Sequence, residues 1–580
     1  MRDHFRILLF DLAAGVSEIV RLDGRDTAVG GSGLAALLYG RYGQPNQPWN
    51  APEQPLIFAI GPLTGYYPIM SKTVCAFKSS YHGQYTESHG GGRTALALFF
   101  AGFDALVIVG RAKRLSCLNI TASRSYLQDV EFLRGRDADF TGKTMRKMLK
   151  IGSGHRSLLR IGQAGEIGSS MACINVDTYR HFGRMGGGAS MGVKNLKGIC
   201  IVGECGFTAP KNKEYNRVYK KVFDQLTATA MMKKYHNLGT AANVKKLNDI
   251  KSLPWNNLQK TTDPEVDGIT GTAFAQKTLL RNAACGGCPV GCIHIGFIRE
   301  KTGDEHRYHY HQTPYDYEPV FAAGSMLGVK NAFDVLRILD VMEKGCIDVM
   351  SGGVALAWAT EATEKGLIDQ RQTIVPLSFG DTEGYKQAAA HLCCGSNDFY
   401  RLLGQGSLKA AERYGGSEFA CVLGQEMAGY ATGELFFAAQ SLGFRHSHLD
   451  TGAYSYDQKH SEQDVEAGVN FLMNDEPGRV FLTSMVACLF ARSVYSNEQL
   501  AECLNALGYN KIASSACEVA EEIRKRRWQV RIATGFNPEK IEIPKRFYKV
   551  KTWKGLINPE YLDALKKEYG HRIMALAEDK

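Results

Sequence analysis

The sequence predicts a multidomain α+β protein, in which a sheet-rich N-terminal domain is followed by two mostly α-helical domains. Three observations support this prediction. The chain has 580 residues, 44% of them apolar, which is enough for about two to four separate cores. Residues 1–208 alternate short β-type runs with turns. From residue 209 onward, the apolar residues recur with the period of amphipathic helices.

Apolar runs of strand length dominate the first region. They are FRILLFDL (5–12), PLIFAI (55–60), TVCAFKSS (73–80), DALVIVG (104–110), SLLRIGQ (157–163), SMACINV (170–176) and KGICIVG (197–203). Two windows, near residues 30–42 and 92–101, have helical periodicity instead. We therefore expect residues 1–208 to form a domain that is mainly sheet.

The second region is rich in amphipathic segments that end at glycine or polar residues. The clearest are KEYNRVYKKVFDQLTATAMMKK (213–234), NAFDVLRILDVMEKG (331–345), VALAWATEATEKGL (354–367) and SACEVAEEIRKRRWQ (515–529). A turn sequence, RYGGSE, occupies residues 413–418. It predicts a division into one helical domain of residues 209–415 and another of residues 416–580.

Composition and charge exclude several classes of protein. We find no apolar stretch of about 18 residues, and the first apolar run is too short for a signal peptide, so we expect no membrane span and a cytoplasmic location. The net charge of +10 is concentrated near residues 522–531 and 544–555. This pattern is typical of a solvated basic face or of a docking patch for an acidic partner. Nucleic acid is not expected, because no recognition motif accompanies the charge.

Three cysteines lie close together in RNAACGGCPVGCIHIG, at Cys285, Cys288 and Cys292. Fifteen cysteines in a chain of this kind indicate reduced thiols, some of them metal ligands. Unrelated core thiols would not sit in a glycine- and proline-rich loop. A zinc site would need a second ligand pair, which is not at hand. A [4Fe–4S] cluster commonly takes three cysteines from one loop and a fourth from far away. Cys488, which we expect on an apolar helix, is the most suggestive fourth ligand.

Glycines gather at four places: residues 61–65, 90–92, 186–192 and 285–291. The chain has 62 glycines, more than the usual share of about 7%. Glycine lets the backbone pass close to a bulky ligand, because no side chain obstructs it. The clusters therefore predict that the chain wraps around a large cofactor.

Several motifs in sequence order resemble those of the tungsten-containing aldehyde:ferredoxin oxidoreductases. They are GPLTGYYPIMSK (61–72), SHGGG with AGFDALVIVGRA (88–112), DTYRHFGRMGGGASMGVKNLKGI (177–199), CGGCPVGC (285–292), YEPVFAAGSMLGV (317–329), ATEKGLI (362–368), GQEMAGY (424–430) and CLF (488–490). The resemblance implies tungsten, or molybdenum, held by two pyranopterins on the N-terminal sheet domain. It also implies a [4Fe–4S] cluster on Cys285, Cys288, Cys292 and Cys488.

The resemblance assigns cofactor-binding roles to a further set of residues. These are Lys72, His89, Gly90, Gly91, Arg184, Gly186, Gly187, Gly188, Ala189 and Asp348. Backbone N–H groups in glycine-rich turns bind phosphate, which each pterin carries. Arg184 would be a charge partner of that phosphate, with Lys194 and Lys197 nearby. Asp348 would accept N–H bonds from a pterin edge.

The chain departs from the family pattern at two of these positions. Lys72 stands where the family has an arginine, and it would hold a phosphate as a point charge. His89 stands where the family has an asparagine that helps to seat a magnesium ion between the pterins. This second departure puts the magnesium ion in question.

Glu318, Tyr317 and His448 resemble the reacting groups of the family. A carboxylate near the substrate carbonyl would handle a proton, and a histidine would polarise the carbonyl oxygen. The neighbouring His446 makes the histidine assignment ambiguous. Glu318 could instead be a charge at a helix N-terminus, and His448 a core histidine. Between the cysteine loop and Glu318, residues 305–318 carry His306, His309 and His311. We expect a loop there that narrows the substrate channel or contacts a partner.

The resemblance implies an oxidoreductase that converts an aldehyde to a carboxylic acid and passes electrons to ferredoxin or to an iron–sulfur partner subunit. Both a homodimer and a hetero-oligomer are compatible with the sequence. One alternative is the tungsten subunit of benzoyl-CoA reductases. That branch adds a cysteine ligand to tungsten, whereas residues 293–345 contain no cysteine. An alternative of another class is a non-catalytic protein whose metal site serves partner binding.

Overall fold

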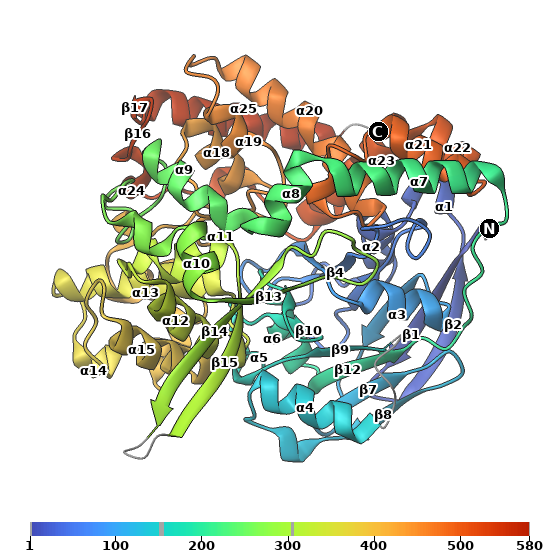
Figure 1. Cartoon of the computed structure of the whole chain (residues 1–580), viewed down its shortest axis with the longest axis horizontal. Coiled ribbons are helices and arrows are strands. Elements are labelled where there is room, and N and C mark those ends of the chain that lie inside the picture. Colours follow the sequence, from blue (N-terminus) through green and yellow to red (C-terminus); the bar gives the residue numbers. More distant parts are fainter. Residues whose placement is uncertain (1–2, 150–155, 303–306, 579–580) are drawn as a thin grey trace.

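Two six-stranded sheets form the N-terminal region of the computed structural model, which describes residues 3–149, 156–302 and 307–578 (Figure 1). The first sheet has the order β2 (Val16–Leu22), β1 (Phe5–Asp11), β6 (Ala105–Val109), β3 (Leu56–Ala59), β4 (Thr73–Lys78), β5 (Tyr85–Gly90). The second has the order β11 (Arg180–Phe182), β10 (Ile174–Val176), β9 (Arg156–Arg160), β12 (Leu196–Val202), β7 (Ser116–Ile120), β8 (Ser125–Asp129). β1 pairs with β6 in parallel, and β7 with β12, while the other neighbours are antiparallel.

One apolar core joins the two sheets. Phe58 and Ile108 of the first sheet share it with Leu159 and Ile199 of the second, and all four are fully buried. The rings of Phe58 and Phe182 meet at 5.5 Å between centroids, edge to face. The N-terminal domain is therefore a sandwich, and its β4–β5 edge is left to face the helical region.

Each of the seven predicted strand runs contains a strand, and the two helical windows match α2 (Gly31–Tyr42) and α3 (Thr94–Ala101). The expectation of a sheet-rich region followed by a helix-rich one is confirmed. Among the described elements of residues 1–208, the strands β2, β5, β7, β8 and β11 and the helix α4 (Ala138–Leu149) were not predicted. Most side chains of β2 are exposed, and β8 has no fully buried residue. Such strands carry no apolar run, so only their pairing with β1 and β7 identifies them.

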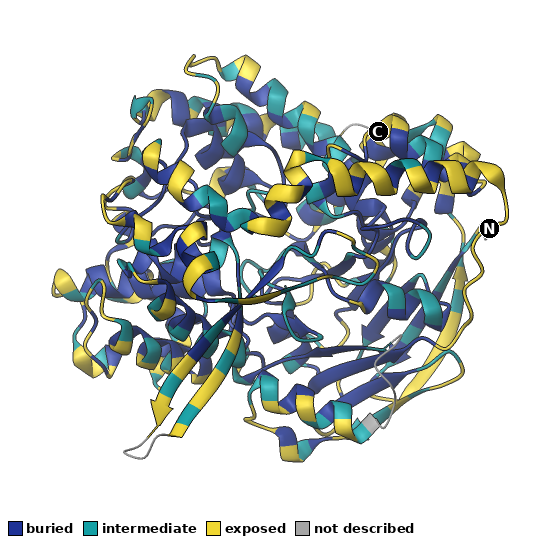
Figure 2. Cartoon of the chain, in the orientation of Figure 1, coloured by how far each residue is buried: buried dark blue, intermediate teal, exposed yellow. Residues whose placement is uncertain are grey.

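Helices make up most of the chain after Lys213 (Figure 1). The first of them, which begins at Lys213, alternates buried and exposed residues along its length (Figure 2). The longer ones are α7 (Lys213–Ala228), α8 (Ala230–Asn237), α12 (Ala332–Gly345), α13 (Val349–Glu364), α15 (Thr382–Cys394), α17 (Ser407–Tyr414), α18 (Glu434–Leu442), α20 (Val465–Ser484), α21 (Asn497–Ala506), α23 (Ala516–Ala533) and α25 (Pro559–Glu578). α13 is buried along nearly its whole length, including Trp358. None of the described helices is long and apolar enough to cross a bilayer. The boundaries near residues 208 and 415 stay predictions.

Within the segment expected to be a loop (residues 305–318), the described residues 307–315 instead form a strand of a small sheet. β13 (Leu279–Ala283), β14 (Ile293–Thr302) and β15 (Arg307–Tyr315) pair antiparallel in that order, and β14 and β15 project from the body in Figure 1. The loop prediction was wrong because polar and aromatic residues alternate here without an apolar run. His309 and His311 lie on the same face of β15, with ring centroids 6.2 Å apart. His311 lies among Glu300, Asp340 and Lys344. His306 lies outside the described residues.

The basic segment of residues 522–531 is only partly a surface feature. Arg524, Arg527 and Arg531 of α23 are 6%, 3% and 0% exposed. Arg527 binds the fully buried Glu87 of β5 through Nε at 2.8 Å and Nη2 at 3.2 Å. The expectation that this segment forms a solvated face or a docking patch is therefore wrong for these three arginines. Arg527 instead holds α23 against β5, and Arg531 holds it against Gln84, the residue before β5. Arg524 joins α23 to Met473 O of α20.

Removing one side of this buried pair should destabilise the protein strongly. We expect Arg527→Leu to lower the free energy of unfolding by about 3–5 kcal/mol, because Glu87 would be left as an unpaired buried charge. Lys220→Ala, which breaks the exposed Lys220–Asp224 pair, should cost less than about 1 kcal/mol. Urea unfolding followed by circular dichroism measures both changes. Equal, small losses would contradict a structural role for the buried pair.

Candidate active site and cysteine group

The four predicted cluster cysteines come together from two distant parts of the chain. Cys285, Cys288 and Cys292 lie in the loop between β13 and β14. Cys488 does not lie on a helix, as expected, but in the turn after α20, as the N-cap of a short 3-10 helix (Leu489–Ala491). Burial raises the pKa of Cys292 to about 12, with further contributions from the charges of the other three thiols. The four side chains therefore share one electrostatic environment.

Backbone contacts fix the cysteine loop against the glycine clusters. Gly286 donates to Gly92 O at 2.9 Å, and Ile69 donates to Gly287 O at 3.0 Å. A Cβ on Gly91 would lie 2.7 Å from Cys285 Sγ, so this close approach requires glycine. The guanidinium of Arg180, a residue not predicted for the site, lies 3.8 Å from Cys292 Sγ. Lys72 Nζ would be 3.5 Å from the Gly91 Cβ position, which puts Lys72 at the same junction.

In the part of the chain that the structure describes, no three His, Cys, Asp or Glu side chains are grouped to hold a single metal ion. All fifteen cysteines are free.

The predicted phosphate loop precedes and forms α6 (Gly187–Gly192). Gly186 has a φ of 87°, and a Cβ there would collide with Ser80 Oγ. Gly187, Gly188 and Ala189 are buried at the start of the helix. Lys194 and Lys197, which were expected to lie near the phosphate, bind other groups. Lys194 Nζ donates to Pro52 O at 2.9 Å, and Lys197 Nζ donates to Arg136 O at 2.7 Å. Both lysines therefore bind carbonyl groups outside the loop, and Lys197 also pairs with Glu166.

Arg184 and Asp348, both predicted to contact the cofactor, bind each other. Arg184 Nε lies 3.1 Å from Asp348 Oδ2, and its Nη2 donates to Glu426 O at 2.6 Å. Asp348 also caps α13, since Oδ2 accepts the N–H of Ser351 at 3.1 Å. The pair therefore links the glycine loop of the sheet domain to the turn between α12 and α13.

Glu318 and His448 lie side by side in a buried site. Glu318 is in the first turn of α11 (Tyr317–Ala323), where Oε2 accepts the N–H of Gly429 at 3.1 Å. Its Oε1 is 3.4 Å from His448 Nε2. Burial raises the pKa of Glu318 to about 8. Burial, followed by the charges of Arg184 and Arg445, lowers the pKa of His448 to about 3. At neutral pH the carboxyl is thus mostly protonated and the imidazole is neutral.

Tyr317 and His446 occupy supporting positions. Tyr317 is fully buried and its hydroxyl donates to Gly429 O, so it holds the residue whose N–H binds Glu318. His446 contacts Gln440 O at 3.2 Å and Arg531 Nη2 at 2.7 Å. Of the two histidines in RHSHLD, His448 is therefore the one beside Glu318.

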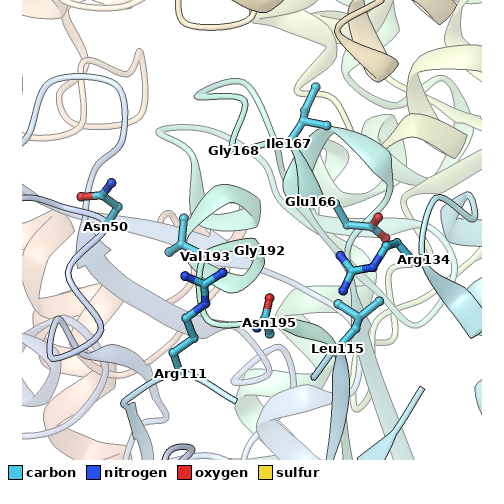
Figure 3. A pocket seen from close by; sticks show the side chains of 10 residues that line it. All are labelled: Asn50, Arg111, Leu115, Arg134, Glu166, Ile167, Gly168, Gly192, Val193 and Asn195. Atoms are coloured by element: carbon cyan, nitrogen blue, oxygen red, sulfur yellow. The ribbon is translucent and has the colours of Figure 1, made fainter. Parts of the chain in front are cut away.

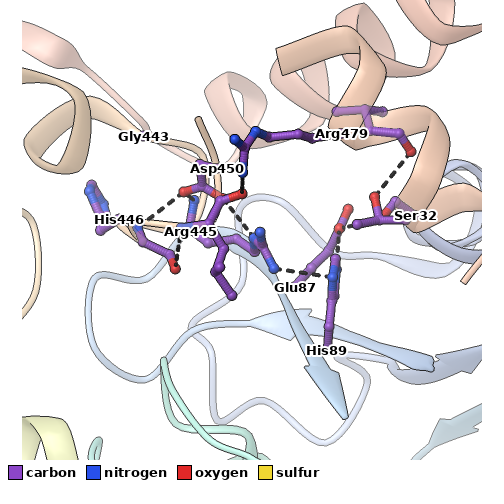
Figure 4. Close-up of polar contacts among 12 residues, drawn as sticks. Ser32, Glu87, His89, Gly443, Arg445, His446, Asp450 and Arg479 are labelled. Atoms are coloured by element: carbon purple, nitrogen blue, oxygen red, sulfur yellow. Dashed lines mark hydrogen bonds and ion pairs between the residues drawn. The ribbon is translucent and has the colours of Figure 1, made fainter. Parts of the chain in front are cut away.

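His89 lies between the carboxylate of Glu87 and the guanidinium of Arg445. Its Nε2 is 3.1 Å from Glu87 Oε2 and its Nδ1 is 3.1 Å from Arg445 Nη1 (Figure 4). Gly90, the next residue, approaches the Phe182 ring so closely that a Cβ would lie 2.8 Å from it. Arg445 was not among the predicted site residues. It immediately precedes His446 in the chain, in a segment without a recognisable motif.

Several polar atoms around these residues are buried and have no hydrogen-bond partner among the described residues. They are Glu318 Oε1, His448 Nδ1, Arg180 Nε, Arg184 Nη1, Glu426 Oε2 and Ser80 Oγ. Buried polar atoms without partners cost free energy, and a group of them is typical of a site that holds a polar ligand. The donor set, two guanidinium groups and a hydroxyl facing glycine backbone, fits a phosphate-bearing cofactor.

A surface pocket of about 270 Å³ lies apart from this site (Figure 3). Its lining is mostly polar and contains none of the predicted site residues: Asn50, Arg111, Leu115, Arg134, Glu166, Ile167, Gly168, Gly192, Val193 and Asn195. Arg134 is paired with Glu131, and Glu166 with Lys197. The pocket is not connected to the chemistry of Glu318 by any of its lining residues.

The four thiols share one electrostatic environment, and the carboxyl of Glu318 can exchange a proton near neutral pH. Redox enzymes use groups of both kinds. Comparison with family models names the class more closely. The model for the N-terminal domain of aldehyde ferredoxin oxidoreductase matches residues 7–203, and the model for its domains 2 and 3 matches residues 217–572. The chain therefore belongs to the aldehyde ferredoxin oxidoreductase family, as its motifs predicted, and is an oxidoreductase.

Individual relatives agree with this assignment. The chain is 28% identical to the tungsten-containing aldehyde ferredoxin oxidoreductase of Pyrococcus furiosus, over 90% of this chain and 87% of that one. The Thermococcus kodakarensis enzyme of the same name gives the same values. A WOR-like subunit of an aliphatic sulfonate oxidoreductase from P. furiosus is 26% identical over 79% of this chain and 74% of its own length. Among solved structures, the active-site complex BamBC of benzoyl coenzyme A reductase, bound to 1,5-dienoyl-CoA, has a TM-score of 0.82 and 18% identity. It covers 98% of this chain and 95% of the matched chain, and it shows the fold.

Proposed function

We propose that the protein is a bis-pyranopterin enzyme, with tungsten or molybdenum, that oxidises an aldehyde to a carboxylic acid. The reaction is RCHO + H2O → RCOO⁻ + 3H⁺ + 2e⁻. The observation that carries this proposal is the buried Glu318–His448 pair, which lies beside Arg184 and the predicted phosphate loop. The names of the relatives, tungsten-containing aldehyde ferredoxin oxidoreductases, support the choice of metal and substrate class.

The cofactor would be held by the glycine backbone and by a few charged groups. Gly186, Gly187, Gly188 and Ala189 would offer N–H groups to a pterin phosphate, and Arg184 would supply a charge. Lys72, Gly90 and Gly91 would contact the cofactor where it meets the cysteine loop. When bound, the metal accepts two electrons from the substrate. Asp348 would contact a pterin edge while it remains the cap of α13.

Cys285, Cys288, Cys292 and Cys488 would hold a [4Fe–4S] cluster, because four thiols in one environment are the usual ligand set of such a cluster. The loop contacts Gly91 and Gly92 directly, so the cluster would lie close to the pterin site. We propose that electrons leave through it, one at a time, to ferredoxin or to an iron–sulfur partner subunit. A cytoplasmic location would suit the free cysteines.

Glu318 and His448 would have different roles in the reaction, one in proton transfer and the other in polarising the substrate carbonyl. Glu318 in its ionised form would take a proton as the aldehyde carbon gains an oxygen. His448, neutral at working pH, would donate one N–H to the carbonyl oxygen of the substrate. Tyr317 acts through Gly429, whose N–H keeps the carboxyl of Glu318 in place. Tyr317 is fully buried, and the side chains of Glu318 and His448 are only 15% and 12% exposed, so little bulk water would reach the reacting groups.

The pH dependence of the reaction should reflect Glu318. Its pKa is raised to about 8 by burial, so the ionised form that takes the proton becomes abundant only as the pH rises through that value. We expect kcat/KM to increase from about pH 6 and to level off above about pH 9. Steady-state rates with a viologen acceptor measure this. A profile that is flat across that range would contradict proton transfer to Glu318.

The benzoyl-CoA reductase alternative rests on the fold alone, because the matched structure is 18% identical. Its expected extra cysteine is also missing from residues 293–345. The non-catalytic alternative is not supported, since the family consists of oxidoreductases.

Metal and pterin analysis of anaerobically purified protein tests the proposal. We expect tungsten or molybdenum, four irons, and pterin fluorescence after oxidation. Protein without either metal and without pterin would overturn the proposal.

A further inference from the structure

The guanidinium of Arg180 lies against the cysteine loop. Arg180 begins β11, an edge strand of the second sheet, and pairs with Val176 of β10. Its Nη2 donates to Cys292 Sγ at 3.8 Å. A Cβ on Gly91 would lie 3.6 Å from Arg180 Cγ and 2.7 Å from Cys285 Sγ. Arg180 therefore lies close to the thiols at both ends of the cysteine loop.

The charge of Arg180 acts on these two thiols. Burial alone would raise the pKa of Cys285, but the charge of Arg180, followed by that of Lys72, lowers it below its ordinary value. The charge of Arg180 also opposes the rise that burial causes in the pKa of Cys292. Because a guanidinium stays protonated in proteins, Arg180 is a permanent positive charge beside the sulfur atoms.

The donors of Arg180 fit an iron–sulfur cluster. Arg180 Nε is buried and has no hydrogen-bond partner among the described residues. Burial would lower the pKa of Arg180, but the charges of the two thiols, followed by that of Asp316, raise it above its ordinary value. The thiols are therefore stronger partners of this guanidinium than Asp316 is. The sulfur atoms of a cluster accept hydrogen bonds, so a guanidinium with a buried donor to spare suits the site.

A positive charge near a cluster favours the reduced form of that cluster. Reduction adds an electron, so the reduced cluster is the more negative form and a nearby cation stabilises it more. Hydrogen bonds to the sulfur atoms act in the same direction, and both effects are known to set cluster potentials. Arg180 is partly buried, so water screens its charge less than it screens a charge on the surface. Loss of this charge should therefore lower the reduction potential.

We propose that Arg180 raises the reduction potential of the cluster, because it holds a permanent positive charge and an N–H donor against the sulfur atoms of Cys285 and Cys292. The inference rests on the proposed function, since it requires the cluster to be present. Arg180 supplies no ligand to iron. It makes the cluster a better acceptor for the electrons that the substrate releases, and so sets the range of potentials that a partner protein must match.

Potentiometric titration of the anaerobically purified holoenzyme, with electron paramagnetic resonance of the reduced cluster, tests this inference. We expect Arg180→Gln to lower the midpoint potential of the cluster. The equilibrium constant for reduction should fall about tenfold, which is about 59 mV for one electron. Arg180→Lys keeps the charge but loses the planar fork, so its potential should lie between those of Arg180→Gln and the wild type. The iron and tungsten contents should not change in either variant.

Arg281→Gln is the matched control. It removes an equal charge from β13, the strand that leads into the cysteine loop, but the side chain is exposed and contacts Tyr179. Screening by water should therefore leave the potential nearly unchanged.

An unchanged potential in Arg180→Gln, with four irons retained, would overturn the inference and leave the proposed function intact, and so would an equal shift in Arg281→Gln. Wild-type protein without a cluster would overturn both. If Arg180→Gln does not fold or binds no iron, Arg180→Lys decides. A wild-type potential in that variant would contradict a role for the hydrogen bond between Arg180 and Cys292.

Discussion

Glu318→Gln is expected to abolish aldehyde turnover while leaving the tungsten and iron contents unchanged. The substitution is isosteric, and the amide oxygen of glutamine can still accept the N–H of Gly429. It cannot take a proton, however, and loss of a general base typically costs about 10²–10⁴ in rate. Anaerobic steady-state assays with a viologen, combined with metal analysis of the same samples, measure both quantities.

A buried carboxyl elsewhere in the chain provides the control for this variant. Glu434→Gln changes a residue that is 3% exposed and whose carboxylate accepts the N–H of Asn558. It should retain most of its activity. If Glu318→Gln loses its metals, the residue is structural and the assignment of Glu318 as a base is wrong.

Cys488→Ala should remove the iron–sulfur cluster and preserve the fold. Cys488 lies in a turn, its side chain is only partly buried, and alanine fits the same backbone. The other three thiols all lie in one loop, so loss of the fourth opens one corner of the cluster. We expect most of the iron to be lost, with an unchanged circular dichroism spectrum and with tungsten retained.

Cys503→Ala is the matched control, because Cys503 is buried in the same apolar core and contacts Gln499. It should keep four irons. Four irons in Cys488→Ala would mean that another residue is the fourth ligand.

The sequence predicted strands correctly where buried residues form a continuous apolar run. Strands such as β3 and β6 are apolar throughout and were predicted. β2 exposes most of its side chains and β15 has only two buried residues, and neither was predicted. The three cysteines of the loop were evident from their spacing. Cys488 was chosen from its apolar surroundings, and the resemblance agreed with that choice. Its place in a turn after α20 was missed, because an apolar helix and the turn that follows it have similar composition.

The site was harder to predict, because its contacts join residues that are far apart in the chain. Arg184 meets Asp348 across 164 positions, and His89 meets Arg445 across 356. No local pattern marks such a pair. Lys194 and Lys197 illustrate the converse, since they are adjacent to the glycine loop in sequence but bind carbonyl groups elsewhere. Motifs therefore located the glycine loops and Glu318, and only the folded chain placed Arg445 beside His89.

Anaerobic assay of the holoenzyme with a panel of aldehydes and a low-potential viologen tests the central claim most directly. We predict aldehyde-dependent reduction of two viologens per aldehyde, with the corresponding carboxylic acid as the product. Protein that contains tungsten or molybdenum and four irons, yet reduces viologen with no aldehyde of the panel, would contradict an aldehyde-oxidising site at Glu318 and His448.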